Sequence, residues 1–165
     1  MKKIALAAAT AAIAAFASPA AAQGAPRSWY AGAGYTHYDF ENAEVGGVTG
    51  RLGYRMHPNF AVEGEGTIGT SDDDNAELNG AYGVYGVGIL PVSPSVDLFG
   101  RVGYQQVEVD GVGPVADIDE DGVGYGAGAN FRVSDRFGIR GEYTRLDTGE
   151  DSDADTFSIG GVVNF

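Results

Sequence analysis

The acidic segment "DIDEDG", residues 117–122, has the clearest ligand-like spacing in this 165-residue chain. Asp117, Asp119 and Asp121 match positions one, three and five of an EF-hand calcium loop, and Gly122 matches the turn glycine at position six. Position twelve, where such a loop needs a bidentate Glu, is Gly128. Two interpretations therefore stay open: a weak site for Ca²⁺ or Mg²⁺, and a solvated acidic loop without a metal.

Residues suited to catalysis or cofactor binding are scarce elsewhere. The only histidines are His37 and His57, which lie in separate segments, and no Ser, His and Asp set converges with either of them. The segment "GEGTIG" satisfies G-x-G-x-x-G, but "TSDDDN" follows it instead of the helix that a dinucleotide site requires. The chain has no Cys, which excludes thiol chemistry, disulfides and Cys-ligated metals. We therefore expect neither an enzyme nor a cofactor.

The charge balance argues against nucleic acid as a partner. All 23 carboxylates lie after residue 22, whereas two of the ten basic residues, Lys2 and Lys3, come before it. The remainder of the chain has eight Arg, no Lys and a net charge of 8 minus 23, or −15. Binding to a phosphate backbone requires a basic face, so we expect no nucleic-acid binding.

The first 22 residues have the pattern of a secretory signal peptide. Lys2 and Lys3 precede an apolar stretch of 13 residues, 4–16, and "SPAAAQ" supplies small residues for cleavage after Ala22. Thirteen residues are too few for a membrane-spanning helix, which needs about 20. No linker or long repeat divides the rest, so we expect a mature chain of one domain, residues 23–165.

The elements that position these residues are predicted to be β-strands. Apolar and polar residues alternate in eight runs bounded by turn residues, and the 27 glycines are interspersed with Tyr, Phe and Val. An even number of strands, each long enough to cross a bilayer in about 9 to 11 residues, is typical of bacterial transmembrane barrels. We therefore predict an all-β fold, an eight-stranded antiparallel transmembrane β-barrel with up-and-down meander topology. The runs cover residues 29–40, 46–56, 60–69, 79–90, 96–109, 122–133, 137–146 and 156–165.

The connections between the runs alternate strictly between two kinds. "HPN", "PVSPS" and "SDR" are short, whereas "ENAE", "TSDDDNAEL", "DGVGPVADIDED" and "DTGEDSDAD" hold 16 carboxylates and no Lys or Arg. A barrel in the outer membrane of a Gram-negative cell has short periplasmic turns and longer outer loops. The pattern therefore predicts periplasmic termini and acidic extracellular loops.

Alternation also predicts which side chains face lipid. One face of residues 156–165 is apolar, and so is the corresponding face of residues 137–146. The run 79–90 fits either register. Arg145 points to lipid if alternation is strict, near the strand end where exposure costs about 0 to 1 kcal/mol, or inward if a bulge intervenes. Aromatic residues near run ends predict two interfacial girdles: Trp29, Phe60, Phe99, Phe131, Phe137 and Phe165.

The opposite faces carry charge into the predicted lumen. An eight-stranded barrel is only just wide enough to be filled by side chains, and charges withdrawn from water are costly unless they are paired. Two interpretations follow, an internal plug of ion pairs and a narrow gated pore. The predicted lumen charges are Arg51, Arg55, Glu63, Glu65, Arg101, Arg140 and Glu142.

Several segments resemble the eight-stranded outer-membrane barrel family typified by OmpA and OmpX, which includes opacity-type porins. They are "WYAGAGYTHY", "FGIRGEY", the hairpin "YGVGILPVSPSVDLFGRVGY" and the terminal "FSIGGVVNF". The resemblance covers residues 23–165 and leaves no room for the peptidoglycan-binding domain of two-domain members. It implies that the last strand is the signal read by the barrel-assembly machinery, through Phe157, Ile159, Val163 and Phe165, with a departure at Gly161.

The resemblance implies an integral outer-membrane protein with a structural role in envelope integrity. It implies a monomer whose surroundings are outer-membrane lipid and lipopolysaccharide. Two alternatives remain: a small gated diffusion channel, and surface adhesion or ligand binding through the acidic loops. A soluble lipocalin-like barrel fits less well, because the chain lacks that family's early G-x-W motif and such a barrel does not need a terminal Phe.

Overall fold

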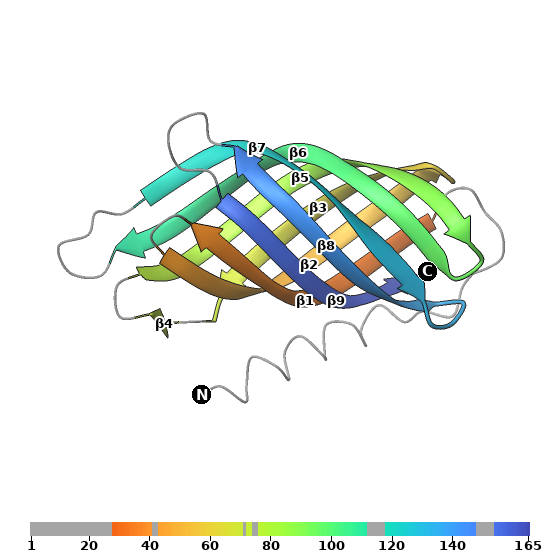
Figure 1. The fold of residues 1–165 in the computed structure, drawn as a ribbon, viewed down its shortest axis with the longest axis horizontal. Coiled ribbons are helices and arrows are strands. Elements are labelled where there is room, and N and C mark those ends of the chain that lie inside the picture. The colour runs from red at the N-terminus through yellow and green to blue at the C-terminus, as the bar shows by residue number, and fades with distance from the viewer. Residues whose placement is uncertain (1–27, 41–42, 71, 74–75, 112–117, 148–153) are drawn as a thin grey trace.

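A computed structural model describes residues 28–40, 43–70, 72–73, 76–111, 118–147 and 154–165 of the chain. All the regular structure in these residues is β-strand, and it forms one sheet (Figure 1). No helix in this described part is long and apolar enough to cross a membrane. The strands are β1 (Ser28–Phe40), β2 (Ala43–His57), β3 (Phe60–Gly69), β4 (Asp72–Asp73), β5 (Ala76–Ser93), β6 (Val96–Gly111), β7 (Ile118–Arg132), β8 (Phe137–Asp147) and β9 (Ala154–Asn164).

Eight long strands close into a barrel, as the alternation predicts. Each pairs antiparallel with its neighbours along the chain, β3 pairs with β5, and β1 pairs with β9 from Tyr30↔Asn164 to Phe40↔Ala154. The ninth strand, β4, has two residues and pairs only with the start of β5. Closure leaves no unpaired edge around the ring, which satisfies the backbone groups of every long strand.

The strands extend further than predicted at one end of the barrel. β2 begins at Ala43, β5 at Ala76, β7 at Ile118 and β9 at Ala154, each two to four residues before the predicted start. The prediction ended strands at polar residues, but backbone pairing across an antiparallel hairpin does not require apolar side chains. We call this end the loop end. The opposite end, which holds the short turns at residues 57–60, 93–96 and 132–137 together with Ser28 and Asn164, is the turn end (Figure 1).

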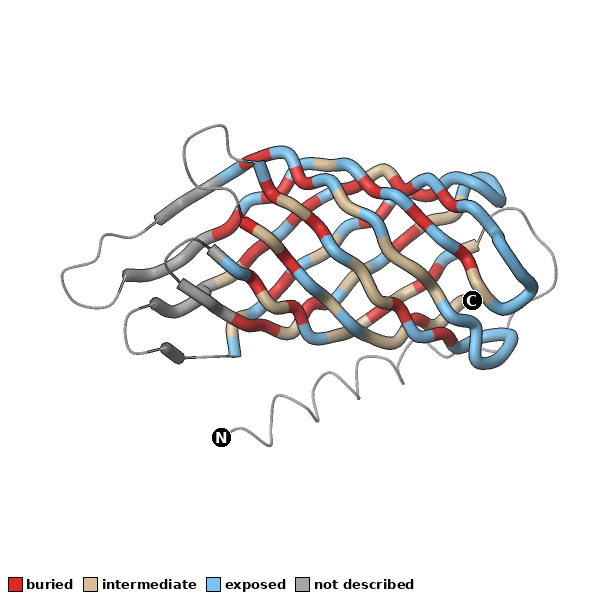
Figure 2. Tube along the Cα trace, in the orientation of Figure 1, coloured by how far each residue is buried: buried red, intermediate tan, exposed pale blue. Residues whose placement is uncertain are grey.

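Buried and exposed residues alternate along the strands, so inward and outward positions are well separated (Figure 2). The structure resolves the register of the fourth long strand, β5, which sequence alternation left open. Tyr85, Val87 and Ile89 are buried in the lumen, whereas Tyr82 and Val84 are exposed on the outer face. The run "AYGVYGVGIL" is apolar at both parities, and only pairing with β3 and β6 selects the inward set.

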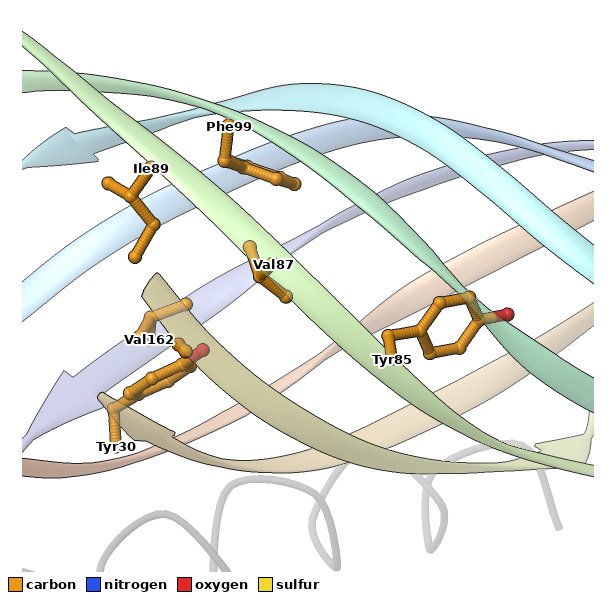
Figure 3. Close-up of a cluster of buried hydrophobic side chains, with 7 residues drawn as sticks. Tyr30, Tyr85, Val87, Ile89, Phe99 and Val162 are labelled. Carbon is orange, nitrogen blue, oxygen red and sulfur yellow. The ribbon is translucent and has the colours of Figure 1, made fainter. Parts of the chain in front are cut away.

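Two apolar clusters fill the lumen on either side of its middle. The turn-end cluster consists of Tyr30, Ala61, Tyr85, Val87, Ile89, Phe99 and Val162 (Figure 3). The loop-end cluster consists of Tyr38, Ala81, Val107, Leu146 and Ala154. Inward glycines make room for the large rings: a Cβ on Gly53 would lie 2.1 Å from Tyr30 Cζ, and one on Gly124 would lie 2.8 Å from Tyr85 Oη. The high glycine content is therefore in part a packing requirement of a narrow lumen.

Candidate functional site

The middle of the lumen holds three arginines and three glutamates, which we call the central network. Glu142 of β8 joins its members. Its carboxylate accepts hydrogen bonds from Arg51 Nη2 at 2.6 Å, Arg101 Nη1 at 2.7 Å and Arg140 Nε at 2.8 Å. Ser158 Oγ also donates to it, at 3.2 Å. One carboxylate therefore links β2, β6 and β9 to β8 across the lumen.

The other two glutamates complete the central network. Glu63, whose side chain is fully buried, accepts Arg140 Nη1 at 2.5 Å, Arg140 Nη2 at 3.0 Å and Tyr30 Oη at 2.6 Å. Glu65 Oε1 lies 2.7 Å from Arg101 Nη2, and Glu65 Oε2 lies 3.1 Å from Arg51 Nη2. Three positive and three negative groups leave the network formally neutral, as expected where charges are withdrawn from water.

The central network is not saturated with hydrogen bonds. Arg51 Nε, Arg101 Nε and Thr144 Oγ1 are buried without a hydrogen-bond partner among the described residues. Two guanidinium groups also stack on aromatic rings, with Arg101 3.4 Å from the Tyr85 centroid and Arg140 3.9 Å from the Phe99 centroid. Aromatic faces attract cations, so the rings stabilise charge that hydrogen bonds leave uncovered.

Phe99 does not belong to an outer girdle, so that prediction is wrong. Its ring is 4 % exposed and lies in the lumen under Arg140. Phe99 and Arg101 are two residues apart in β6, and residues two apart in a strand face the same side. Because Arg101 faces the lumen, Phe99 must face it too. The girdle prediction considered only that Phe99 is near the end of its run and did not consider which face it shares with Arg101.

A row of hydroxyl and amide groups leads from the central network toward the loop end. Thr67 Oγ1 lies 2.7 Å from Thr49 Oγ1 and accepts from Tyr38 Oη at 3.2 Å, while Tyr85 Oη donates to Gln105 Oε1. Sequence reasoning did not select these residues. Parity could have found them, because Thr49, Thr67 and Gln105 stand two or four positions from inward charges in β2, β3 and β6.

Arg55, the seventh predicted lumen charge, lies away from the central network. It is at the turn end, where its Nη2 is 3.7 Å from Asp97 Oδ2, and Arg132 Nη2 is 3.1 Å from the same oxygen. Beside them is a cavity of about 180 Å³, which we call the turn-end cavity. Its lining includes Tyr30, Arg55, Glu63, Asp97, Asn130, Arg132, Asp135 and Arg140.

The outer face of the barrel is apolar between two aromatic zones. Near the loop end, Tyr82, Tyr104, Tyr125 and Tyr143 occupy four successive strands, each displaced two residues from direct pairing with the next. Such diagonal steps follow from strand tilt and place the rings at a common level. Two of the four hydroxyl groups are hydrogen-bonded: Tyr143 Oη donates to Asp155 Oδ1 at 2.7 Å, and Tyr104 Oη donates to Asp121. The zone near the turn end includes Trp29, Phe60, Phe131 and Phe137, all exposed.

Arg145 points outward, so the first of its two predicted orientations is correct. Its side chain is 39 % exposed and its Nη1 lies 3.5 Å from Asp155 Oδ1. Register runs without a shift through the pairs Tyr125↔Arg145 and Arg145↔Asp155, so β8 has no bulge at this point. The guanidinium stands at the level of the tyrosine zone and not at the middle of the apolar face.

The terminal strand places two of its four predicted signal residues clearly on the outer face. Phe157 and Ile159 are exposed, whereas Val163 and Phe165 are partly exposed. Phe165 lies one residue beyond β9, and its backbone N–H donates to Trp29 O at 3.0 Å, which extends the seam with β1. At Gly161 a Cβ would lie 3.1 Å from Phe137 Cε2, so the Phe137 ring covers this position.

The residues of the possible calcium loop lie differently from an EF-hand. Asp119 and Asp121 are in β7, whose backbone is extended, and Asp117 is outside the described residues. Within the described part of the chain, no group of three or more His, Cys, Asp or Glu side chains is placed to hold a metal ion. The "GEGTIG" segment lies inside β3. The two histidines are in β1 and at the end of β2 and do not meet.

Comparison with known proteins agrees with this geometry. A family model described as the outer membrane protein beta-barrel domain matches residues 8–165. Ail, the attachment invasion locus protein of Yersinia pestis, in complex with the heparin analogue sucrose octasulfate, is 18% identical over 86% of this chain and 100% of its own, with a TM-score of 0.65. The N-terminal barrel of Pseudomonas aeruginosa OprF is 11% identical over 82% and 97%, with a TM-score of 0.64.

Neisserial surface protein A is a further structural match, 15% identical over 86% of this chain and 98% of its own, with a TM-score of 0.58. Identities this low establish a shared fold. Comparison with curated protein sequences returns no match. The family model, however, spans nearly the whole chain, and the closed ring of eight strands with an apolar outer face is the architecture it describes. The chain therefore belongs to the outer membrane protein beta-barrel domain family and is an integral β-barrel of the cell outer membrane.

Proposed function

We propose that this protein is a structural, non-catalytic component of the cell envelope whose barrel does not conduct in its resting state. The observation that carries the proposal is the filling of the lumen. The neutral central network lies between an apolar cluster at the turn end and another at the loop end. A water-filled passage would have to displace all three.

The energetics of the central network favour a plug over a gate that opens easily. Moving Glu142 away would leave Arg51, Arg101 and Arg140 without their shared carboxylate. Breaking a buried ion pair by removing one partner costs about 3 to 5 kcal/mol. A state higher by that amount is populated at well below about 1 in 100 molecules. Spontaneous opening would therefore be rare.

We place the turn end in the periplasm and the acidic loops outside the cell. Short turns and both described chain ends share the turn end, and the longer connections share the other. Outer-membrane barrels have this asymmetry. The predicted export signal, residues 1–22, and the predicted assembly residues of the terminal strand belong to the same proposal. So does a monomeric barrel surrounded by lipid and lipopolysaccharide, with Arg145 near their phosphates.

Planar-bilayer recording of the refolded mature chain tests the non-conducting barrel. We expect no stable conductance steps for the unmodified protein. The matched variant Arg101→Ser/Glu142→Ser removes two opposite charges and their side-chain volume from the middle of the lumen. Because both apolar clusters remain in this variant, we expect it to stay closed as well, and conductance of the variant alone would show that the central network by itself closes the lumen. Regular ion-selective openings of the unmodified protein would establish the diffusion channel instead.

A second candidate, binding through the outer loops, is favoured by their charge alone. The four loop segments carry 16 carboxylates and no Lys or Arg. The Ail structure is described with a heparin analogue, a polyanion, which these loops would repel. Any ligand of the loops would therefore be cationic. Binding of whole cells to polylysine-coated and to heparin-coated surfaces tests this, and equal binding to both would contradict it.

A further inference from the structure

The turn-end cavity contains more hydrogen-bond capacity than the protein itself uses. Arg140 and Glu63 satisfy one another through two hydrogen bonds, and Tyr30 also donates to Glu63. Arg55 differs, because its one side-chain ion pair among the described residues is with Asp97, at 3.7 Å, which is too long for a hydrogen bond. Its side chain is about a quarter exposed, and Arg55 lines the cavity. Arg55 therefore offers donors to the cavity that no protein acceptor takes up.

The cavity lining has three arginines and three carboxylates, and Arg55 has the loosest ion pair among its interior charges. Arg55 and Arg132 share a single buried carboxylate, Asp97. Arg140 is balanced by Glu63. The remaining acid of the lining, Asp135, is exposed in the turn between β7 and β8, where water and salt screen its charge. Arg132 is 42% exposed and is screened in the same way. Arg55, whose only carboxylate lies 3.7 Å away and is shared with Arg132, is thus the guanidinium most available to a ligand, and guanidinium groups bind carboxylates through paired hydrogen bonds.

An unused acceptor stands beside these donors. Asn130 Oδ1 is buried, lines the cavity, and has no hydrogen-bond partner among the described residues. Asn130 pairs directly with Asp97 on β6 and with Arg140 on β8, so its side chain is close to both charged groups. A buried acceptor without a donor is costly, and a ligand N–H or O–H would satisfy it.

We propose that the turn-end cavity binds a small carboxylate that carries an adjacent hydrogen-bond donor. The carboxylate contacts Arg55 and Arg132, and the neighbouring N–H or O–H donates to Asn130 Oδ1. The cavity volume, about 180 Å³, admits one small organic anion. Both the C-terminal residue of a peptide and a free α-hydroxy acid have this chemistry. The proposal does not depend on whether the barrel conducts.

The test is a titration of the refolded mature chain in detergent micelles, followed by NMR signals of the Asn130 side-chain amide and the Arg55 guanidinium. The probes are N-acetylalanine, lactate, propionate and N-acetylalaninamide. The first two have a carboxylate and a donor, the third lacks the donor, and the fourth lacks the carboxylate. We expect saturable shifts with N-acetylalanine, lactate or both, about tenfold weaker binding of propionate, and no binding of the amide.

Variants separate the proposed contacts from general charge attraction. We expect Arg55→Gln to weaken carboxylate binding about tenfold or more, and Asn130→Ala to weaken N-acetylalanine and lactate to the level of propionate. Arg136→Gln is the matched control, because Arg136 is an exposed cation at the same end of the barrel, in the turn between β7 and β8, and does not line the cavity. If Arg55→Gln does not refold, Arg55→Lys replaces it, since Lys keeps the charge but loses the paired donors.

Three results would overturn the proposal. The first is the absence of saturable shifts with every probe up to about 100 mM, which would mean that only water occupies the cavity. The second is equal weakening by Arg136→Gln and Arg55→Gln, which would mean unspecific attraction by the turn end. The third is equal binding of propionate and both donor-bearing probes, which would remove the role of Asn130. Preference for N-acetylalanine over lactate identifies the peptide C-terminus as the ligand, and the reverse preference identifies the hydroxy acid.

Discussion

Replacement of Glu142 by Gln tests whether the central network is dry and stabilising. The substitution keeps the shape of the side chain and removes its charge. Glu142 accepts from Arg51, Arg101 and Arg140 at 2.6 to 2.8 Å, so three guanidinium groups would then face only Glu63 and Glu65. The network would change from neutral to one excess positive charge.

The expected loss in the free energy of unfolding is about 3 to 5 kcal/mol, the usual cost of leaving a buried charge without its partner. This loss is large, because the free energy of unfolding of a whole protein is typically about 5 to 15 kcal/mol. Arg51 Nε and Arg101 Nε have no hydrogen-bond partner among the described residues, so the network is not fully satisfied even in the unmodified protein, which places our expectation at the lower end of that range. Heat-modifiable gel migration after urea titration, in micelles or vesicles, measures the change.

Two further variants make this measurement specific. Asp155→Asn removes a carboxylate that also contacts an arginine, Arg145, but on the exposed outer face, and we expect a loss below about 1 kcal/mol. The double variant Arg51→Gln/Glu142→Gln restores neutrality in the central network. Its loss in the free energy of unfolding should therefore be smaller, by about 0.5 to 3 kcal/mol, than the sum of the losses of the two single variants. If Glu142→Gln lowers the free energy of unfolding by no more than Asp155→Asn does, water screens the charges in the lumen. The central network would then not act as a plug.

Three other predictions concern packing, the seam and the outer face. Gly53→Ala should lower the free energy of unfolding by about 1 to 3 kcal/mol, because the added Cβ would overlap the Tyr30 ring. The matched control is Gly64→Ala, which faces outward into open space and should change the free energy of unfolding by less than about 0.5 kcal/mol. Similar urea midpoints for the two variants would contradict this prediction. Deletion of Phe165 should lower the amount of protein assembled in the outer membrane more than it lowers stability of the refolded barrel, and equal losses in fractionation and unfolding assays would reduce Phe165 to a girdle residue. Arg145→Ala should change the free energy of unfolding by less than about 1 kcal/mol, since the residue is near the loop end and its ion pair with Asp155 is exposed. A loss of several kcal/mol in the same urea titration would show that Arg145 anchors the barrel.

Much of the barrel follows from local pattern, because strand periodicity and turn chemistry are properties of neighbouring residues. Period-two alternation predicts the inward positions of Glu63, Glu65, Arg140 and Glu142 without any knowledge of their partners. Alternation does not assign the faces of β5, because that run has apolar residues at both parities. The face of Phe99 was predicted wrongly because its position near a run end was given more weight than its parity with Arg101. Asp97 and Arg132 were missed for a related reason, since they stand at strand ends where alternation has few residues to establish it.

The sequence by itself determined the number of long strands, the segregation of acidic connections to one end, and the face on which most side chains lie. Only the tertiary structure decided which inward charges meet. Arg51 and Glu142 are 91 residues apart, and their 2.6 Å contact depends on the register of every strand between them and on closure of β1 against β9. Arg55 lies outside the central network because it is four residues beyond Arg51 in β2, close to the turn at 57–60, and closure places it beside a cavity with an unused acceptor. Periodicity specifies a direction for each side chain, whereas register and tilt specify its height in the barrel, and chemistry in a lumen requires both.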